Sequence, residues 1–193
     1  MRTRRALAAF TLLVLAGAAL SLRVVRVTDK EMLPSIAPGD WLLLGPGSPS
    51  PGEVFVVHDP TDPGREVLRR VVGVAGHQVR VAEDHLEIDG SRARIREMGR
   101  DNKHLVLSEN NAWLVRRQLE PSRVNPEATL VDEDRVWVLA DARDLATDSR
   151  WWGSISKNAL GRQVWVRFGP ANDWRDLFAW QAMDGPWFVP PPS

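Results

Sequence analysis

The chain has no cysteine, very few lysines and no excess of charge of either sign. The absence of cysteine excludes disulfides, cysteine-ligated zinc and a thiol nucleophile. The chain has 22 arginines but only three lysines, which are Lys30, Lys103 and Lys157. Any lysine general base must therefore be one of these three. Lysine plus arginine and aspartate plus glutamate both number 25, and this zero net charge argues against nucleic acid as a partner.

Internal repeats are absent, and so are long amphipathic helical patterns beyond the N-terminal segment. A chain of 193 residues is long enough for a single domain with a hydrophobic core. Short hydrophobic runs separated by proline and glycine predict that this domain is mainly β. The clearest hairpin signal is Asp89-Gly90, because glycine accepts the positive φ of a type I′ turn. The predicted strands are residues 41–44, 53–57, 67–74, 78–82, 85–89, 104–107, 112–115, 135–139 and 162–168.

The last of these strands has the clearest alternation, which predicts that Val164, Val166 and Phe168 share one face. Short helices are predicted at residues 144–150 and 173–182. Residues 27–168 are expected to form the β domain, with an insertion at about 97–134 where the periodicity is weak and polar. Residues 170–193 form a tail rich in tryptophan and proline, which either packs on the domain or lies at a membrane interface.

The N-terminus carries a hydrophobic targeting segment. Three arginines among the first five residues precede an uncharged run at residues 6–22, which spans roughly 25 Å as a helix. Two interpretations remain open: an uncleaved membrane anchor at residues 1–22, or a signal peptide cleaved near Ala16-Gly17-Ala18. In both cases the positive-inside rule predicts a cytoplasmic N-terminus and a domain on the outer side of the membrane.

Three short sequence boxes follow in order: EMLPSIAPGD at residues 31–40, REVLRRVVGVAGHQV at 65–79 and ADARDLATDSRWWG at 140–153. Together they resemble the motifs of the bacterial type I signal peptidases, serine–lysine dyad proteases of the S26 type. The resemblance covers most of residues 27–168. It implies a single signal-peptidase-like β domain behind one N-terminal transmembrane helix, held in the cytoplasmic membrane with the domain on the outer, periplasmic side.

Many residues fit these motifs and are assigned by the resemblance to the scaffold or to the substrate-binding part of the site. They are Met32, Pro34, Ser35 and Asp40 in the first box, Arg70 in the second, and Asp141, Arg143, Asp148, Ser149 and Arg150 in the third.

The resemblance also implies that the catalytic positions have changed. Glu31 holds the place of the serine nucleophile, Arg69 that of the lysine base, and Ala146 that of the serine that orients the lysine. Arginine cannot act as the base, because its guanidinium does not deprotonate at accessible pH. Glutamate has no hydroxyl, so losing the dyad should cost several orders of magnitude in rate. None of the family's catalytic residues is therefore intact.

If the chain has the family's fold, the side chains of Glu31 and Arg69 lie where the serine and the lysine of the dyad meet. Either substitution alone would leave an unpaired charge in a half-buried position, whereas the two charges compensate each other. We therefore expect an ion pair between the two side chains.

Two functional hypotheses follow. In the first, the chain is a non-catalytic homologue that binds signal peptides, exported precursors or another partner at the membrane. In the second, it is an active signal peptidase that cleaves after Ala-x-Ala through displaced residues, such as Lys30 and Ser35. The four histidines have no ligand spacing, so no metal site is predicted, and no cofactor is expected. The oligomeric state is not indicated by the sequence.

Overall fold

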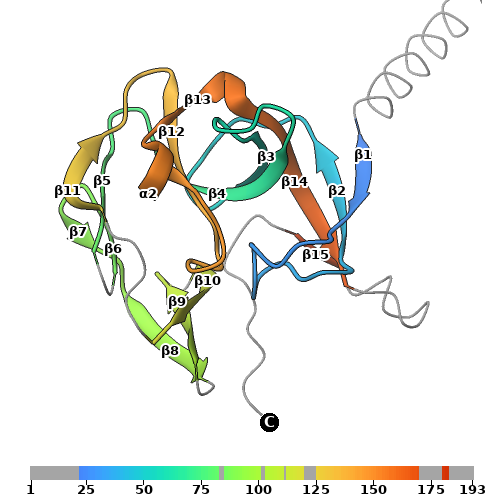
Figure 1. Cartoon of the computed structure of the whole chain (residues 1–193), viewed down its shortest axis with the longest axis horizontal. Coiled ribbons are helices and arrows are strands. Elements are labelled where there is room, and N and C mark those ends of the chain that lie inside the picture. The colour runs from blue at the N-terminus through green and yellow to red at the C-terminus, as the bar shows by residue number, and fades with distance from the viewer. Residues whose placement is uncertain are drawn as a thin grey trace, which may run out of the picture.

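The structure is a computed structural model in which most described residues belong to β-strands (Figure 1). Within the part of the chain that it describes, no helix is long and apolar enough to cross a membrane. The predicted anchor at residues 1–22 lies, apart from Leu22, outside the described residues. These residues are 22–82, 85–100, 103–110, 112–119, 125–169 and 180–182.

The largest sheet has the strand order β1-β2-β14-β3-β4-β12-β13, and β15 pairs with β14. Every neighbouring pair in it is antiparallel. Its strands are β1 (Arg23–Arg26), β2 (Trp41–Gly45), β14 (Leu160–Phe168), β3 (Val54–His58), β4 (Glu66–Val74), β12 (Arg135–Leu139), β13 (Ile155–Ser156) and β15 (Trp180–Ala182).

Two smaller sheets extend the domain on the side away from β1 (Figure 1). In one of them the predicted hairpin is confirmed, since β6 pairs with β7 across Asp89 and Gly90, which have φ values of 51° and 72°. The four-stranded sheet has the order β11 (Asn125–Leu130), β5 (Gln78–Val81), β6 (Leu86–Ile88) and β7 (Ser91–Arg92). The three-stranded sheet has the order β10 (Trp113–Gln118), β9 (His104–Glu109) and β8 (Ile95–Arg100).

The segment predicted as an insertion supplies strands to both small sheets. Its buried residues Leu107, Trp113 and Val115 share a hydrophobic cluster with Val79 and Trp137. The boundaries 97–134 stay a prediction, but the segment contributes to a core that is continuous with the flanking strands.

Both predicted helices differ from the structure. Residues 144–148 are not helical, and α2 (Ser149–Trp152) begins only after Asp148, whose side chain accepts a hydrogen bond from the Arg150 backbone amide as the N-cap. Residues 180–182 form β15 instead of a helix, and residues 173–179 lie outside the described residues. A further short helix, η1 (Lys157–Ala159), and the strands β1, β8, β11 and β13 were not predicted, because their local patterns are weak and cross-strand pairing stabilises them.

A bulge in β14 overturns the predicted alternation of that strand. Val164 pairs with Leu44 and Val166 pairs with Leu43, so Trp165 is the extra residue between them. Val164 therefore faces the core, where it is fully buried, while Val166 lies on the opposite face.

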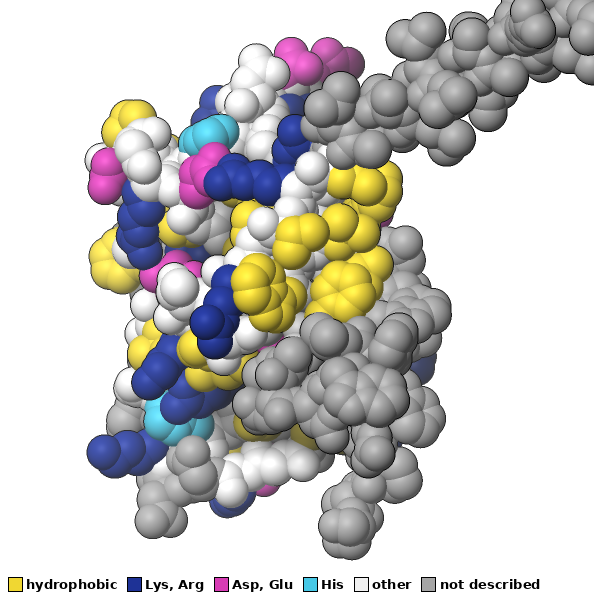
Figure 2. Space-filling model, turned by 90° about the vertical axis from the view of Figure 1, so that its right-hand side faces the viewer, with side chains coloured by type: hydrophobic (Ala, Val, Ile, Leu, Met, Phe, Trp, Pro, Cys, Tyr) yellow, Lys and Arg dark blue, Asp and Glu magenta, His cyan; other side chains and the backbone are white. Residues whose placement is uncertain are grey.

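The outward face of β1, β2 and β14 is also apolar. Val24 lies opposite Leu43 in the register, and Val24, Trp41 and Trp165 are 58%, 38% and 36% exposed. Hydrophobic side chains gather on this side of the molecule (Figure 2). We call the surface formed by Val24, Trp41, Leu43 and Trp165 the outer apolar face.

Candidate functional site

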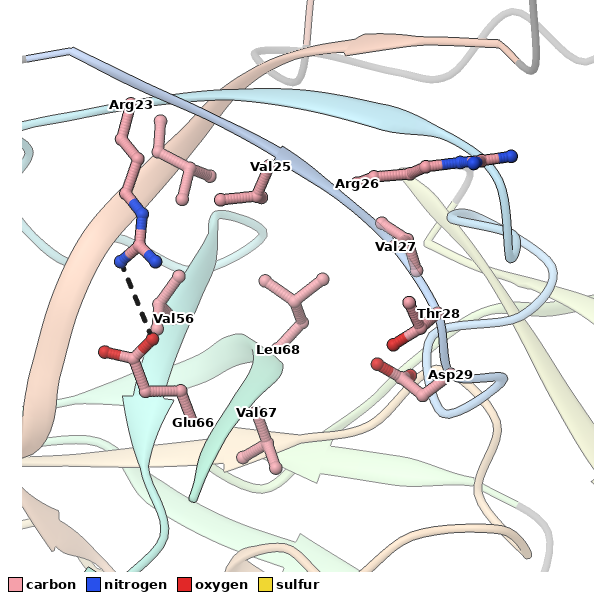
Figure 3. A pocket seen from close by; sticks show the side chains of 11 residues that line it. Arg23, Val25, Arg26, Val27, Thr28, Asp29, Val56, Glu66, Val67 and Leu68 are labelled. Carbon is pink, nitrogen blue, oxygen red and sulfur yellow. Dashed lines mark ion pairs between the residues drawn. The ribbon is translucent and has the colours of Figure 1, made fainter. Parts of the chain in front are cut away.

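A groove lies between β1 and the beginning of β4. Among the described strands, β1 pairs with β2 alone, so its other edge is open. β12 pairs with residues 70–74 of β4, and no described strand pairs with residues 66–69 on that side. The two open edges face each other across a cavity of about 210 Å³ (Figure 3). Its lining residues are Arg23, Val25, Arg26, Val27, Thr28, Asp29, Leu44, Val56, Glu66, Val67 and Leu68.

The groove has an apolar floor and polar ends. Val25, Val56 and Leu68 form the floor and pack on the hydrophobic cluster of Val27 and Met32. At one end the Arg23 guanidinium lies 3.8 Å from the Glu66 carboxylate, joining the two walls (Figure 3). At the other end the side chains of Thr28 and Asp29 point from the β1 wall toward β4 (Figure 3). This shape suits an extended chain with small apolar side chains.

The expected ion pair between Glu31 and Arg69 is confirmed. Glu31 follows the β1 wall, and its Oε2 lies 2.9 Å from Arg69 Nη2. Its other carboxylate oxygen, Oε1, accepts a hydrogen bond of 2.6 Å from Arg65 Nη2. Each oxygen of the Glu31 carboxylate is therefore bound by one guanidinium, so two positive charges face this one negative charge.

Arg69 is completely buried, and each of its three guanidinium nitrogens donates a hydrogen bond. Its Nε and Nη2 donate to the Thr147 carbonyl at 3.0 and 2.7 Å, and its Nη1 donates to the Leu68 carbonyl at 2.5 Å. The guanidinium carbon also lies 5.6 Å from the centroid of the Trp152 ring. Thr147 directly follows Ala146, whose side chain has no hydroxyl. The backbone carbonyl of Thr147 orients the Arg69 guanidinium here instead.

Arg65 links this pair to a further carboxylate. Asp59 is 2% exposed, and its Oδ2 lies 3.4 Å from Arg65 Nη1. Burial pushes the pKa of the Asp59 carboxyl upward, but hydrogen bonds from Thr61 and the charge of Arg65 outweigh burial and hold that pKa below its ordinary value. Asp59, Arg65, Glu31 and Arg69 therefore form a row of alternating charges.

The second and third boxes are joined by a buried ion pair. Arg70 Nε and Nη2 donate to the two oxygens of Asp141 at 2.9 and 2.6 Å, and both side chains are about 1% exposed. Arg70 Nη1 also donates to the Gly52 carbonyl at 2.5 Å. This bidentate geometry fixes β4 against the end of β12.

Asp148 and Arg150 hold the third box together. Asp148 Oδ2 accepts a hydrogen bond of 3.0 Å from the Ala140 amide, and both of its oxygens accept from the Arg150 guanidinium at 2.8 Å. Arg150 Nη2 donates to the Arg143 carbonyl at 2.6 Å. Ser149 Oγ accepts from the Val138 amide at 2.9 Å.

Arg143 makes a separate buried contact. Its Nη2 lies 2.8 Å from Glu109 Oε2, which also accepts a hydrogen bond of 2.9 Å from Trp113 Nε1. These contacts are structural, since all the groups are buried and none lines the groove.

The first box is anchored under the groove. Met32 is fully buried, Pro34 is partly buried, and the Ser35 hydroxyl, 5% exposed, donates to the Leu114 carbonyl at 3.1 Å. Asp40 Oδ2 accepts a hydrogen bond from the Ala37 amide at 2.8 Å and lies 3.2 Å from Arg167 Nη1. The Ala142 amide donates to the Glu31 carbonyl at 2.9 Å, which brings the first and third boxes together.

Sequence reasoning missed Asp29, Asp59, Arg65 and the groove itself. The run Asp59-Pro60-Thr61 was a detectable signal, because an aspartate two residues before threonine favours a side-chain-capped turn. Nothing local indicated that Arg65 reaches Glu31, which is 34 residues away in the chain.

This arrangement places an ion pair of two charged side chains beside an open groove. Glu31 and Arg69 offer neither a hydroxyl nor a neutral amine. The groove beside them offers two open strand edges and an apolar floor.

Comparisons with known proteins agree on one family. A family model described as signal peptidase, peptidase S26, matches residues 1–168. The probable signal peptidase I-1 of Synechocystis is 26% identical over 163 residues, which are 78% of this chain and 73% of that protein. Signal peptidase I of Pseudomonas aeruginosa is 24% identical, with 70% of this chain and 58% of that protein covered.

Two further proteins are similar. Signal peptidase IB of Staphylococcus aureus is 23% identical, with 79% of this chain and 80% of that protein covered. The crystal structure of a signal peptidase I from Enterococcus faecalis is 23% identical with a TM-score of 0.41, covering 61% of this chain and 97% of that chain.

Proposed function

The chain belongs to the signal peptidase family of the peptidase S26 type, and from this premise we propose that it is a membrane-anchored, exported member that binds peptides without cleaving them. The observation that carries the proposal is the Glu31–Arg69 ion pair, 2.9 Å long, next to a groove that remains open. By the motif match, these two residues hold the positions of the serine nucleophile and the lysine base.

The environment of the pair supports the loss of catalysis. A serine nucleophile needs a neighbouring group with a free lone pair to accept its proton. Arg69 has no acceptor, and its three guanidinium nitrogens donate to the Thr147 and Leu68 carbonyls. Glu31 is anchored by two guanidiniums, so its carboxylate is charge-compensated where it lies.

The groove supports retained peptide binding. β1 and β4 are separated by an odd number of intervening antiparallel strands, so they run in the same direction. An extended peptide between them can pair with both open edges, while its alternate side chains contact the apolar floor. The narrow floor of Val25, Val56 and Leu68 favours small apolar side chains, as in an Ala-x-Ala segment.

The alternative, an active peptidase with Lys30 and Ser35 as displaced residues, has less support. The Ser35 hydroxyl is buried and donates to the Leu114 carbonyl, whereas Lys30 is exposed. A nucleophile has to face the substrate, and Ser35 does not line the groove.

The direct test uses the full-length protein in detergent micelles and a fluorescent peptide that contains Ala-x-Ala. We expect saturable binding by fluorescence anisotropy and no cleavage by mass spectrometry. Val25→Asp should weaken binding about tenfold or more, because it puts a carboxylate into the apolar floor. The matched control is Leu130→Asp on β11, whose side chain is 56% exposed outside the groove, and this variant should leave binding unchanged.

Each other outcome has a definite meaning. Cleavage by the native protein that disappears in Ser35→Ala would establish the active alternative. Equal affinities of Val25→Asp and the native protein would remove the groove as the binding site. If neither the native protein nor any variant shows saturable binding, the proposed peptide-binding function is wrong.

We also propose that the outer apolar face lies against the lipid surface. β1 begins at Arg23, directly after the hydrophobic run at residues 6–22, so an anchored chain would hold this face close to the bilayer. Tryptophan and arginine favour such an interface, and the Arg26 guanidinium lies 5.9 Å from the Trp41 ring centroid.

The absence of cysteine makes this proposal testable by single-site labelling. An environment-sensitive dye on Val24→Cys should shift its emission to the blue when the full-length protein is in lipid nanodiscs. The same dye on Leu130→Cys should report water, since Leu130 is 56% exposed on β11, in a different sheet. Identical spectra at the two positions would contradict the orientation.

A further inference from the structure

Asp29 lies at the end of the groove nearest the Glu31–Arg69 pair. Its side chain lines the groove and points toward the β4 wall (Figure 3). Its Oδ1 accepts a hydrogen bond of 2.9 Å from the backbone amide of Glu31. An aspartate that bonds to the amide two residues later is a common turn geometry, but here the bonded amide belongs to the residue at the nucleophile position.

Glu31 follows the lining residue Asp29 by two positions, so its amide lies just beyond the Thr28–Asp29 end of the groove. Sites that cleave amides aim backbone N–H groups at the oxygen of the attacked carbonyl, where negative charge develops. In this chain the corresponding N–H is taken by a carboxylate of the protein itself. The same carboxylate repels the partial negative charge of an incoming carbonyl.

The surrounding cations do not neutralise this carboxylate by direct pairing in the described part of the chain. Arg65 and Arg69 both bind Glu31, and Arg23 pairs with Glu66 at the opposite end of the groove. Arg26 lines the groove, but its guanidinium lies 5.9 Å from the centroid of the Trp41 ring on the outer apolar face. Lys30, the neighbour in sequence, is exposed to solvent.

We propose that Asp29 sets the ligand preference of the groove: it disfavours a peptide carbonyl beside the Glu31 amide and favours a cationic N–H donor at that point. This inference rests on the proposed peptide-binding function and specifies its ligand class, an extended small-residue segment followed by a basic group. Asp29 is thus a specificity-determining residue, and it also blocks the donor that hydrolysis would need.

The test compares two peptides with the full-length protein in micelles at about pH 6, where a secondary amine is protonated. The first is an ordinary Ala-x-Ala peptide. In the second, the carbonyl of the second alanine is replaced by a methylene, which turns the following amide into a protonated secondary amine. The native protein should bind the amine peptide about tenfold more tightly than the ordinary one.

Asp29→Ala should reverse this order, because it frees the Glu31 amide for a carbonyl and removes the attraction for the amine. A reversal of preference separates a specificity role from a structural one, since partial unfolding weakens both peptides alike. Asp62→Ala is the matched control: Asp62 Oδ1 accepts from the Gly64 amide at 3.3 Å in a similar turn outside the groove. This variant changes the net charge equally and should keep the native preference.

An unchanged ratio of affinities in Asp29→Ala would overturn the inference while leaving peptide binding in place. Equal changes in Asp29→Ala and Asp62→Ala would also overturn it, because the effect would then be one of overall charge. If no variant binds either peptide, the proposed function fails, and this inference fails with it.

Discussion

A variant that combines Glu31→Ser, Arg69→Lys, Ala146→Ser and Asp29→Ala should cleave an exported precursor, and the native protein should not. Glu31→Ser restores the nucleophile hydroxyl, Arg69→Lys restores the amine, and Ala146→Ser restores the hydroxyl that orients this amine. Asp29→Ala frees the backbone amide of residue 31. The variant without Asp29→Ala should be slower by about a hundredfold, the effect of one missing oxyanion donor. The rates are measured on a labelled precursor with full-length protein in micelles.

Single reversions provide the controls for this series. Glu31→Ser alone leaves the buried Arg69 without its carboxylate, and Arg69→Lys alone leaves Glu31 in the nucleophile position. Each single variant should therefore remain inactive, since the catalytic groups act as a unit. A quadruple variant that is folded and binds peptide but does not cut would show that the scaffold has lost more than these four positions.

Replacing Asp141 by alanine should lower the free energy of unfolding by about 3–5 kcal/mol. The carboxylate receives two hydrogen bonds from Arg70, and both side chains are about 1% exposed, so the variant leaves a buried guanidinium without its counter-ion. The measurement is urea unfolding of the full-length protein in micelles, followed by tryptophan fluorescence. The double variant Arg70→Met, Asp141→Leu should recover much of the loss, because it removes both charges.

A surface pair supplies the comparison for Asp141. Glu97 and Arg100 form an ion pair of 2.8 Å with side chains that are 48% and 61% exposed. Glu97→Ala should change the free energy of unfolding by less than about 1 kcal/mol, because solvent screens the pair. Similar losses in Glu97→Ala and Asp141→Ala would mean that burial of the Arg70–Asp141 pair does not determine its contribution.

The three boxes were the strongest information in the sequence. Spacing in the first box singled out Glu31, and the second assigned Arg69 to the base position without knowledge of any contact. The resemblance to the family fold, together with charge compensation, then predicted that the two would pair, and the structure contains that pair at 2.9 Å. The hairpin at Asp89-Gly90 was equally secure, since a single glycine signal determines a local turn.

Long-range contacts could not be predicted in this way. Local periodicity did not reveal the bulge at Trp165, which moves Val164 and Val166 to opposite faces of β14. The reach of Arg65 to Glu31 depends on how the β3–β4 loop folds back, and no pattern around either residue encodes that distance. The short strand β1 directly follows the hydrophobic run at residues 6–22, and its four residues carry too little pattern to predict a strand, although its open edge forms one wall of the groove.

The sequence by itself determined the family, the mainly β class and the identity of the side chains at the positions that the motif match assigns to the dyad, because these depend on residue type and local spacing. The tertiary structure decided which groups those side chains contact. It brought Arg65 and Arg69 onto one carboxylate, directed the Arg69 guanidinium to the Thr147 carbonyl, and left two strand edges facing each other beside Asp29. Such contacts depend on how distant strands curl and pair, and that arrangement is set by the packing of the whole domain.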